Sequence, residues 1–270
     1  MGRSRRRSQI SPILWVPAGV ALALLVLPLV ALVVRAPWGQ LVELLSRQTV
    51  AQALGLSLGT AALSTVLCLL LGVPLAVVLA KSINWPPAAR RLLRALVTVP
   101  LVLPPVVGGV ALLLLLGRRG LLGQWLDEWF DFTIPFTTVA VVIAQVFVAM
   151  PFLVLAVEGA LRGSDSRFEI AAATLGASRW TVFRRVTLPL VAPGVSAGAL
   201  LCFTRALGEF GATITFAGSF PGVTQTLPIA TYLELQRDPD AAIALSLVLM
   251  IVSVVVLVSL RDRWVPGLSS

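Results

Sequence analysis

The sequence predicts an all-α integral membrane protein with about six transmembrane helices. Of its 270 residues, 58% are hydrophobic and only 12% are charged, and the mean hydropathy is +0.96. A water-soluble domain of this length usually carries about a quarter charged residues. Charge is absent here from long apolar runs and gathered in the connections between them, which is typical of helices that cross a bilayer.

The apolar runs have the length that a bilayer requires. A helix needs roughly 20 apolar residues to cross about 30 Å of hydrocarbon, because each residue rises about 1.5 Å. Six runs qualify, at about 12–34, 54–80, 92–116, 136–161, 188–210 and 241–260. The first follows a basic stretch, as a signal peptide does, but its apolar part is longer than the usual core of about 7 to 15 residues. We therefore expect an uncleaved first span.

The Lys and Arg residues predict the orientation of these spans. The connections on one side hold 15 of them, those on the other side hold 5, and Arg205 lies within the fifth span. The side richer in Lys and Arg is normally cytoplasmic. We therefore expect a cytoplasmic basic segment at 1–11, a transmembrane domain at 12–260 with a cytoplasmic loop at about 162–187, and a cytoplasmic tail at 261–270. The acidic tip around Asp127, Glu128 and Asp131 is expected outside.

Composition also excludes several kinds of site. The chain has no histidine, which removes the usual imidazole metal ligands and any Ser-His-Asp triad. Its only lysine, Lys81, follows Ala80, so no phosphate-binding Gly-x-x-x-x-Gly-Lys-Ser/Thr loop is present. The net charge of +9 lies beside apolar spans rather than on a soluble basic face, which argues against nucleic-acid binding. Cys68 and Cys202 both fall in apolar runs and are expected to act as small hydrophobic residues.

Helix breakers interrupt several spans. Pro74 lies in the second and Pro151 in the fourth, whereas the third holds a cluster: Pro100, Pro104, Pro105, Gly108 and Gly109. Each proline removes a backbone donor and frees a carbonyl, which a membrane tolerates where protein or a water-filled cavity supplies partners. The cluster predicts that the third span borders such a cavity. Ordinary packing kinks are the alternative, and for Pro74 the more natural one.

Charged and small residues gather near the end of the fifth span. Arg205 and Glu209 are four residues apart, share a helix face and can pair. They either line the inner pathway or its gate, or form a neutral pair that fixes the fifth helix to a neighbour. Hydroxyl and glycine residues in the second span are expected mainly to let helices approach closely. The candidates for the pathway or gate are Pro104, Pro105, Gly108, Arg205, Gly208, Glu209, Gly211 and Thr213.

The connection between the fourth and fifth spans predicts a docking knob. It reads as a short Ala-rich helix, a glycine that turns the chain at Gly176, a second short helix with Trp180 and Phe183 on one side, and a proline opening the next span. The alternative is an amphipathic segment lying on the anionic inner leaflet, which its arginines would favour.

This connection resembles the coupling loop of permease subunits of binding-protein-dependent ABC importers. The family pattern is Glu-Ala-Ala, three residues, Gly, nine residues, Ile, one residue and Leu-Pro. In this sequence Ile170 stands at the position of the acid, which is displaced to Glu169, and Val186 stands at that of the isoleucine. The resemblance implies a coupling loop made by Glu169, Ala171, Ala172, Gly176, Ala177, Val186, Leu188 and Pro189.

Two other segments are similar to molybdate permeases. They are Pro100-Leu-Val-Leu-Pro-Pro-Val-Val-Gly108 and Arg205-Ala-Leu-Gly-Glu-Phe-Gly-Ala-Thr213, and the stretch with Pro221-Gly222 and Thr226-Leu-Pro228 extends the match. Sulfate and thiosulfate permeases share the Leu-Gly-Glu-Phe-Gly part. The resemblance thus implies a type I-like importer permease for molybdate, and also for tungstate, with a sulfate or thiosulfate importer as the alternative.

The same resemblance implies the partners. Two copies of this chain would form the pathway in a bacterial or archaeal plasma membrane, two separate ATPase subunits would bind ATP and Mg, and an extracytoplasmic protein would deliver the oxyanion. This chain itself would bind no cofactor and no metal, and would catalyse no reaction. A secondary transporter with its own coupling-ion site is the competitor from another class, since the broken third span could supply such a site.

Overall fold

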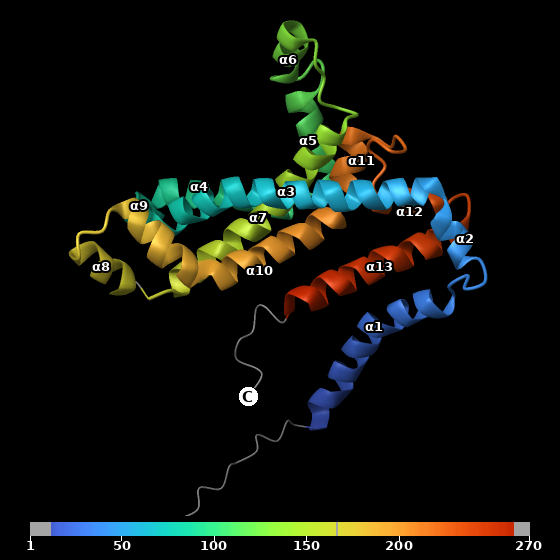
Figure 1. Cartoon of the computed structure of the whole chain (residues 1–270), viewed down its shortest axis with the longest axis horizontal. Coiled ribbons are helices and arrows are strands. Elements are labelled where there is room, and N and C mark those ends of the chain that lie inside the picture. The colour runs from blue at the N-terminus through green and yellow to red at the C-terminus, as the bar shows by residue number, and fades with distance from the viewer. Residues whose placement is uncertain (1–11, 166, 262–270) are drawn as a thin grey trace, which may run out of the picture.

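The computed structural model describes residues 12–165 and 167–261, and the described chain is helical throughout its regular structure. Four long helices run side by side and are labelled in Figure 1 as α3, α7, α10 and α13. They span Gln48–Lys81, Thr138–Gly163, Leu188–Leu207 and Pro239–Arg261. Helix α1, Trp15–Val34, follows a short 3-10 turn and lies on the outside, where it touches α13 and buries no residue within the chain. The predicted segments at 1–11 and 262–270 lie outside the described residues.

Five of the predicted spans are confirmed as single helical runs that are long and apolar enough to cross a membrane. These described runs are Trp15–Val34, Gln48–Lys81, Thr138–Gly163, Arg179–Leu207 and Pro239–Val256. Helix α3 begins at Gln48 rather than at about 54, because its polar first turns continue the helix beyond the apolar part. Pro74 and Pro151 lie inside α3 and α7 without ending them, so they act as kinks and not as breaks.

The third predicted span is present as two helices that are bent at the predicted cluster of prolines. It consists of α4, Pro87–Val102, and α5, Pro105–Leu116, and their axes are bent by 115°. The physical reason is the Pro-Pro pair: Leu103 and Pro104 are both extended, with ψ of 133° at each, since a residue before proline avoids the helical region. At about 1.5 Å per residue, neither half reaches across roughly 30 Å of hydrocarbon by itself.

Helix α5 points away from the long helices and carries α6, Gly123–Phe130, at its far end (Figure 1). Arg118 Nε donates a hydrogen bond to Asp127 Oδ2 at 2.9 Å, and this contact raises the pKa of Arg118 above its ordinary value. The tilted rings of Trp125 and Trp129 lie 5.4 Å apart between centroids, and both side chains remain accessible. The arm formed by α5 and α6 therefore projects from the bundle with aromatic side chains uncovered.

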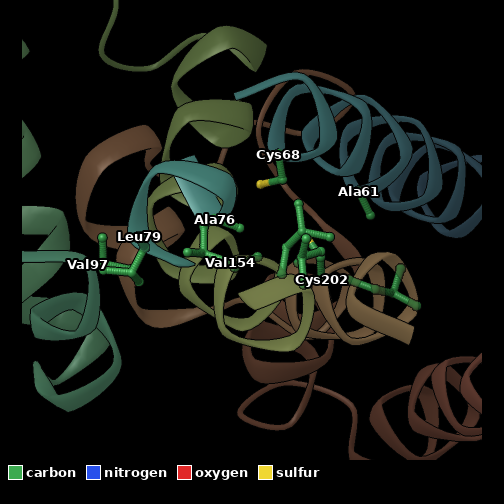
Figure 2. Packing of buried hydrophobic residues seen from close by; sticks show 12 residues of the cluster. Ala61, Cys68, Ala76, Leu79, Val97, Val154 and Cys202 are labelled. Carbon is green, nitrogen blue, oxygen red and sulfur yellow. The ribbon is translucent and has the colours of Figure 1, made fainter. Parts of the chain in front are cut away.

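The main core lies where α3 and α10 pack on α7, and Figure 2 shows its buried side chains. Small residues allow this close approach: a Cβ added at Gly72 would lie 3.0 Å from Leu153 Cδ2, and one at Gly198 would lie 3.0 Å from Leu153 Cδ1. Cys68 and Cys202 are free thiols buried in the same cluster, as the sequence predicts.

Polar side chains within α3 also bond to neighbouring helices. Ser64 Oγ donates to Gln145 Oε1 on α7 at 2.9 Å, and Gln145 Nε2 donates to Thr60 Oγ1 at 3.1 Å. Ser57 Oγ accepts the backbone N–H of Leu227 at 2.6 Å, where α12, Leu227–Glu234, begins. These buried hydroxyls tie neighbouring helices together.

The remaining helices are short connections. Helix α2, Leu41–Ser46, precedes α3 at one end of the bundle, and α8, Arg167–Thr174, and α9, Arg179–Val182, lie at the opposite end (Figure 1). A 3-10 turn at Ser82–Asn84 joins α3 to α4, and a π-helical turn at Phe183–Thr187 joins α9 to α10. Helix α11, Gly211–Ala217, follows α10 after a break. The described chain thus has two breaks, one between α4 and α5 and one between α10 and α11. The exposed loop formed by α8 and α9 lies at one end of the bundle.

Candidate functional site: a broken-helix junction and an exposed loop

The fifth predicted span ends at a break that Glu209 organises. Helix α10 stops at Leu207, and α11 begins at Gly211. Between them, Glu209 Oε1 accepts the backbone N–H of Ala212 at 2.8 Å and so caps the first turn of α11. A carboxylate is favoured there because the first N–H groups of a helix lack partners and carry partial positive charge.

The predicted pair of Arg205 and Glu209 is formed. Arg205 NH1 lies 2.8 Å from Glu209 Oε2, and this contact is an ion pair without the alignment of a hydrogen bond. The Glu209 side chain is 1% exposed and that of Arg205 is 29% exposed. The Glu209 carboxylate therefore contacts only groups inside the protein, whereas the Arg205 guanidinium keeps donors that solvent or a solute can reach.

The two breaks meet in space. An added Cβ at Gly211 would lie 3.0 Å from Pro105 Cβ, and one at Gly109 would lie 2.7 Å from Thr215 Cβ and 2.8 Å from Ala212 O. Helix α5 therefore packs on α11 through glycine, with almost no space between the backbones. We call residues 103–109 and 205–215 the broken-helix junction. Small residues are required there because any side chain would separate the two short helices.

The structure brings most of the predicted pathway residues to this junction. Pro104 and Pro105 begin α5, and Gly208 lies exposed at the end of α10. Gly108 instead packs against Phe147 of α7, and an added Cβ would lie 2.9 Å from Phe147 Cε1. Thr213 is fully buried, and its hydroxyl has no hydrogen-bond partner among the described residues. Thr213 thus faces the protein interior in this state.

Sequence reasoning missed a second charged group. Glu158 of α7 is 2% exposed and binds two arginines: both of its carboxylate oxygens lie 2.9 Å from Arg94 NH2 on α4, and Oε1 lies 2.7 Å from Arg162 NH2. An acid inside an otherwise apolar predicted span, four residues before an arginine, was the available signal. Gly109 was noted as a helix breaker but not as a site residue, because its contact with α11 is tertiary.

The exposed loop has the predicted helix–turn–helix form. Gly176 has φ of +82°, its N–H bonds to Ala173 O at 3.0 Å, and the N–H of Ala177 bonds to Ala172 O at 3.1 Å. These two bonds form a Schellman motif with glycine in the left-handed position. Ser178 then caps α9 by accepting the N–H of Thr181 at 3.2 Å. Local capping thus sets the sharp turn at the tip.

The tip of this loop presents apolar side chains to solvent. Leu175 is 88% exposed, and Phe168, Ile170 and Trp180 are exposed as well. Trp180 and Phe183 lie 5.7 Å apart between ring centroids, on one side as predicted. Such a patch at the end of a structured turn is typical of a contact with another protein or with a membrane surface.

Residues of the predicted coupling loop hold it together rather than all facing outward. Thr187 Oγ1 donates to Glu169 Oε1 at 2.6 Å, so the displaced acid fastens α8 to the π-helical turn before α10. Ala171 and Pro189 are exposed, whereas Ala172, Ala177, Val186 and Leu188 are half-buried. Among the described residues, no group of three or more His, Cys, Asp or Glu side chains could hold a metal ion.

Membrane-length helices with two adjoining breaks, and an exposed apolar loop that lies between those breaks in the sequence, define the class as a multi-pass membrane protein. The chain belongs to the family of binding-protein-dependent transport system inner membrane components, which residues 72–266 match. Among solved structures, the chain matches a bacterial ABC transporter involved in the import of the acidic polysaccharide alginate, with a TM-score of 0.71, 17% identity, and 95% of each chain covered. The inward-facing MetNI methionine ABC transporter matches with a TM-score of 0.61 and 18% identity, covering 82% of this chain and 96% of that chain. These two likenesses show the fold.

Curated relatives are more similar in sequence. The molybdenum transport system permease protein ModB of Mycobacterium tuberculosis is 51% identical over 249 residues, 92% of this chain and 93% of that protein. ModB of Escherichia coli K12 is 40% identical over 218 residues, 81% and 94% of the two chains. The sulfate transport system permease protein CysT of E. coli K12 is 35% identical over 242 residues, 88% and 86% of the two chains.

Proposed function

We propose that this chain is the permease subunit of an ATP-driven importer that carries molybdate, and also tungstate, across the bacterial or archaeal plasma membrane. The observation that carries the proposal is the 51% identity, over nearly the full length, to a molybdenum transport permease. The lower identity of 35% to a sulfate permease supports sulfate as the second candidate substrate.

The partners follow from the same assignment. Two copies of the chain enclose the pathway, two separate ATPase subunits bind ATP and Mg, and an extracytoplasmic binding protein delivers the anion. The family's dependence on a binding protein supports the last partner. The exposed loop at 162–187 docks on the ATPase, with Leu175 and Trp180 as its outermost apolar side chains. Both termini and this loop face the cytoplasm, as the distribution of Lys and Arg predicts.

The chain offers a direct mechanical connection from the loop to the junction. The π-helical turn runs without interruption into α10, and α10 ends at Leu207, two residues before Glu209, whose carboxylate caps α11. Helix α11 in turn packs on α5 through Gly109. A displacement of the loop by the ATPase would therefore move α10 along its length of about 30 Å and shift the two broken helices together. Access would alternate between the two sides, with no covalent chemistry on any residue of this chain.

The experiment is uptake at limiting external oxyanion, followed together for molybdenum, tungsten and sulfur in cells with and without this chain. Selective loss of molybdenum uptake, with or without loss of tungsten uptake, is the expected result. Selective loss of sulfur uptake would move the assignment to sulfate. Co-purification of the chain with an ATPase separates the importer from a secondary transporter, which needs no such subunit.

A further inference from the structure

A second charged feature lies at the end of the bundle that carries the exposed loop. A cavity of about 250 Å³ opens where α3 ends, α4 begins and α7 ends, and it is lined by Leu79, Ile83, Arg90, Arg91, Arg94 and Arg162. Since a water molecule takes up about 30 Å³ of liquid, the cavity has room for a group of several heavy atoms.

Positive charge is in excess in this cavity. Its four guanidinium groups face one carboxylate, that of Glu158, which Arg94 and Arg162 already share. Among the described residues, Arg90 and Arg91 form no ion pair with an acid, and the Nε of Arg91 donates only to Pro87 O at 3.2 Å. Within the described part of the chain, the cavity therefore holds two arginines without an acidic partner and two that share one carboxylate.

The cavity geometry favours an anion with several oxygens. The Arg94 and Arg162 side chains are 49% and 45% exposed, so donors that do not face Glu158 remain accessible. The 16-residue helix α4 also begins beside the cavity, and its N-cap residue, Pro86, supplies no side-chain cap. Guanidinium groups and a helix N-terminus both favour phosphate-type oxyanions.

A separate, apolar cavity lies further along α4, beginning at Leu93. It has a volume of about 530 Å³, fills the angle between α4 and α5 over α7, and includes Leu93, Leu96, Val97 and Pro100 in its lining. Exposed Trp85, at the arginine end, is a residue type typical of the membrane interface. A charged end at the interface and an apolar end toward the middle of the bilayer match the two parts of a phospholipid.

We propose that these two cavities form one binding site for an anionic phospholipid, with the headgroup phosphate against Arg90 and Arg91 and an acyl chain against Leu96 and Pro100. The lipid phosphate offsets part of the arginine charge, and the acyl chain fills the angle between the two halves of the broken span. It thereby stabilises the bent form of α4 and α5.

The test measures lipid binding to the purified importer, containing the full chain, after delipidation. Phosphatidylglycerol and phosphatidylcholine with identical acyl chains are titrated, and bound lipid is counted by native mass spectrometry together with the thermal unfolding midpoint. We expect at least about tenfold tighter binding of phosphatidylglycerol, which corresponds to about 1.4 kcal/mol. Arg90→Gln/Arg91→Gln should abolish the difference, and Arg35→Gln/Arg119→Gln, which removes equal charge from exposed sites elsewhere, should keep it.

Four results would overturn the proposal. Equal binding of the two lipids would show that the site does not recognise an anionic headgroup. An unchanged preference in Arg90→Gln/Arg91→Gln would show that these two arginines do not bind it. Stabilisation by inorganic phosphate or molybdate as strong as that by phosphatidylglycerol would assign the arginines to a soluble oxyanion. Disulfide crosslinking of two copies through Leu96→Cys, with no lipid bound, would assign the apolar cavity to the second copy. The elution volume of the assembled importer reports whether each variant folds.

Discussion

The contact between α5 and α11 predicts a steep penalty for one added methyl group at Gly109. In Gly109→Ala, the new Cβ would lie 2.7 Å from Thr215 Cβ, 2.8 Å from Ala212 O and 3.1 Å from Ala212 Cα. Two of these atoms belong to the backbone, so no side-chain rotation relieves the clash. Because carbon atoms pack optimally at about 3.5–4.0 Å, the two helices must separate by roughly 0.7 Å or more.

The expected loss of stability in Gly109→Ala follows from the behaviour of tightly packed cores. Overpacking by a methyl group typically costs about 1–3 kcal/mol, which for a protein of this size lowers the unfolding midpoint by roughly 2–4 °C per kcal/mol. Since α11 is capped by Glu209 at the end of α10, the displacement also reaches the junction. We expect Gly109→Ala to lower both the unfolding midpoint of the purified importer and molybdenum uptake.

Two matched glycines calibrate this experiment. Gly59 lies in α3 with no atom within 4 Å of an added Cβ, so Gly59→Ala should preserve both stability and uptake. Gly108→Ala meets only Phe147 Cε1, at 2.9 Å, and should give an intermediate loss that Phe147→Leu relieves. A Gly109→Ala importer as stable and active as Gly59→Ala would refute the close packing of the junction.

Three further substitutions test the other contacts. Glu209→Ala loses the cap on α11 and is expected to be less stable than the unchanged chain by about 1–2 kcal/mol. Glu209→Gln keeps an acceptor for the N–H of Ala212, so it should unfold at a higher temperature than Glu209→Ala. Equal unfolding midpoints of the two variants would contradict the capping role. Gly176→Arg places a side chain at φ of +82°, strained by about 1–2 kcal/mol, on the exposed tip. It should abolish co-purification with the ATPase and transport while the chain still inserts, and an assembled, active importer would count against the docking role. The isosteric Thr187→Val removes the 2.6 Å bond to Glu169 and should leave the ATPase bound but reduce transport per ATP hydrolysed, whereas Thr187→Ser, which keeps the hydroxyl, should not. An unchanged ratio in Thr187→Val would exclude coupling through this bond.

The sequence predicted those features whose causes are local. The apolar runs gave five of the six spans, since length and hydropathy alone decide whether a helix can cross a bilayer. The turn at Gly176 was predictable because its cap involves only residues within the same loop. The pair of Arg205 and Glu209 was predictable for the same reason, as the two are four residues apart.

Features that depend on tertiary contacts were not predictable in this way. Pro104 and Pro105 predicted a break in the helix. The bend of 115° could not be predicted, because it depends on the packing of α5 against α11. Glu158 was missed because the arginine that holds it from α4 is 64 residues away in the sequence. The need for glycine at 109 likewise arises from Ala212 and Thr215, which no local pattern indicates.

These contacts show which parts of the chain are tied to one another and which are held by few contacts. The loop, α10 and α11 are joined end to end through the bond of Thr187 to Glu169 and the cap at Glu209, so a force on the loop has a continuous path to the junction. Helix α1 buries no residue and touches only the periphery, so it gives little resistance to such a movement. Helix α7 packs on α10 in the main core and also contacts α11, and its Glu158 binds Arg94 of α4. Under the proposed coupling to an ATPase, a displacement of the loop must open the contact of α5 with α11, or carry both helices together, before it breaks the ion pairs of Glu158. Glycine-to-backbone packing has no side chain to stretch, whereas long arginine side chains can follow a shift of about 1 Å.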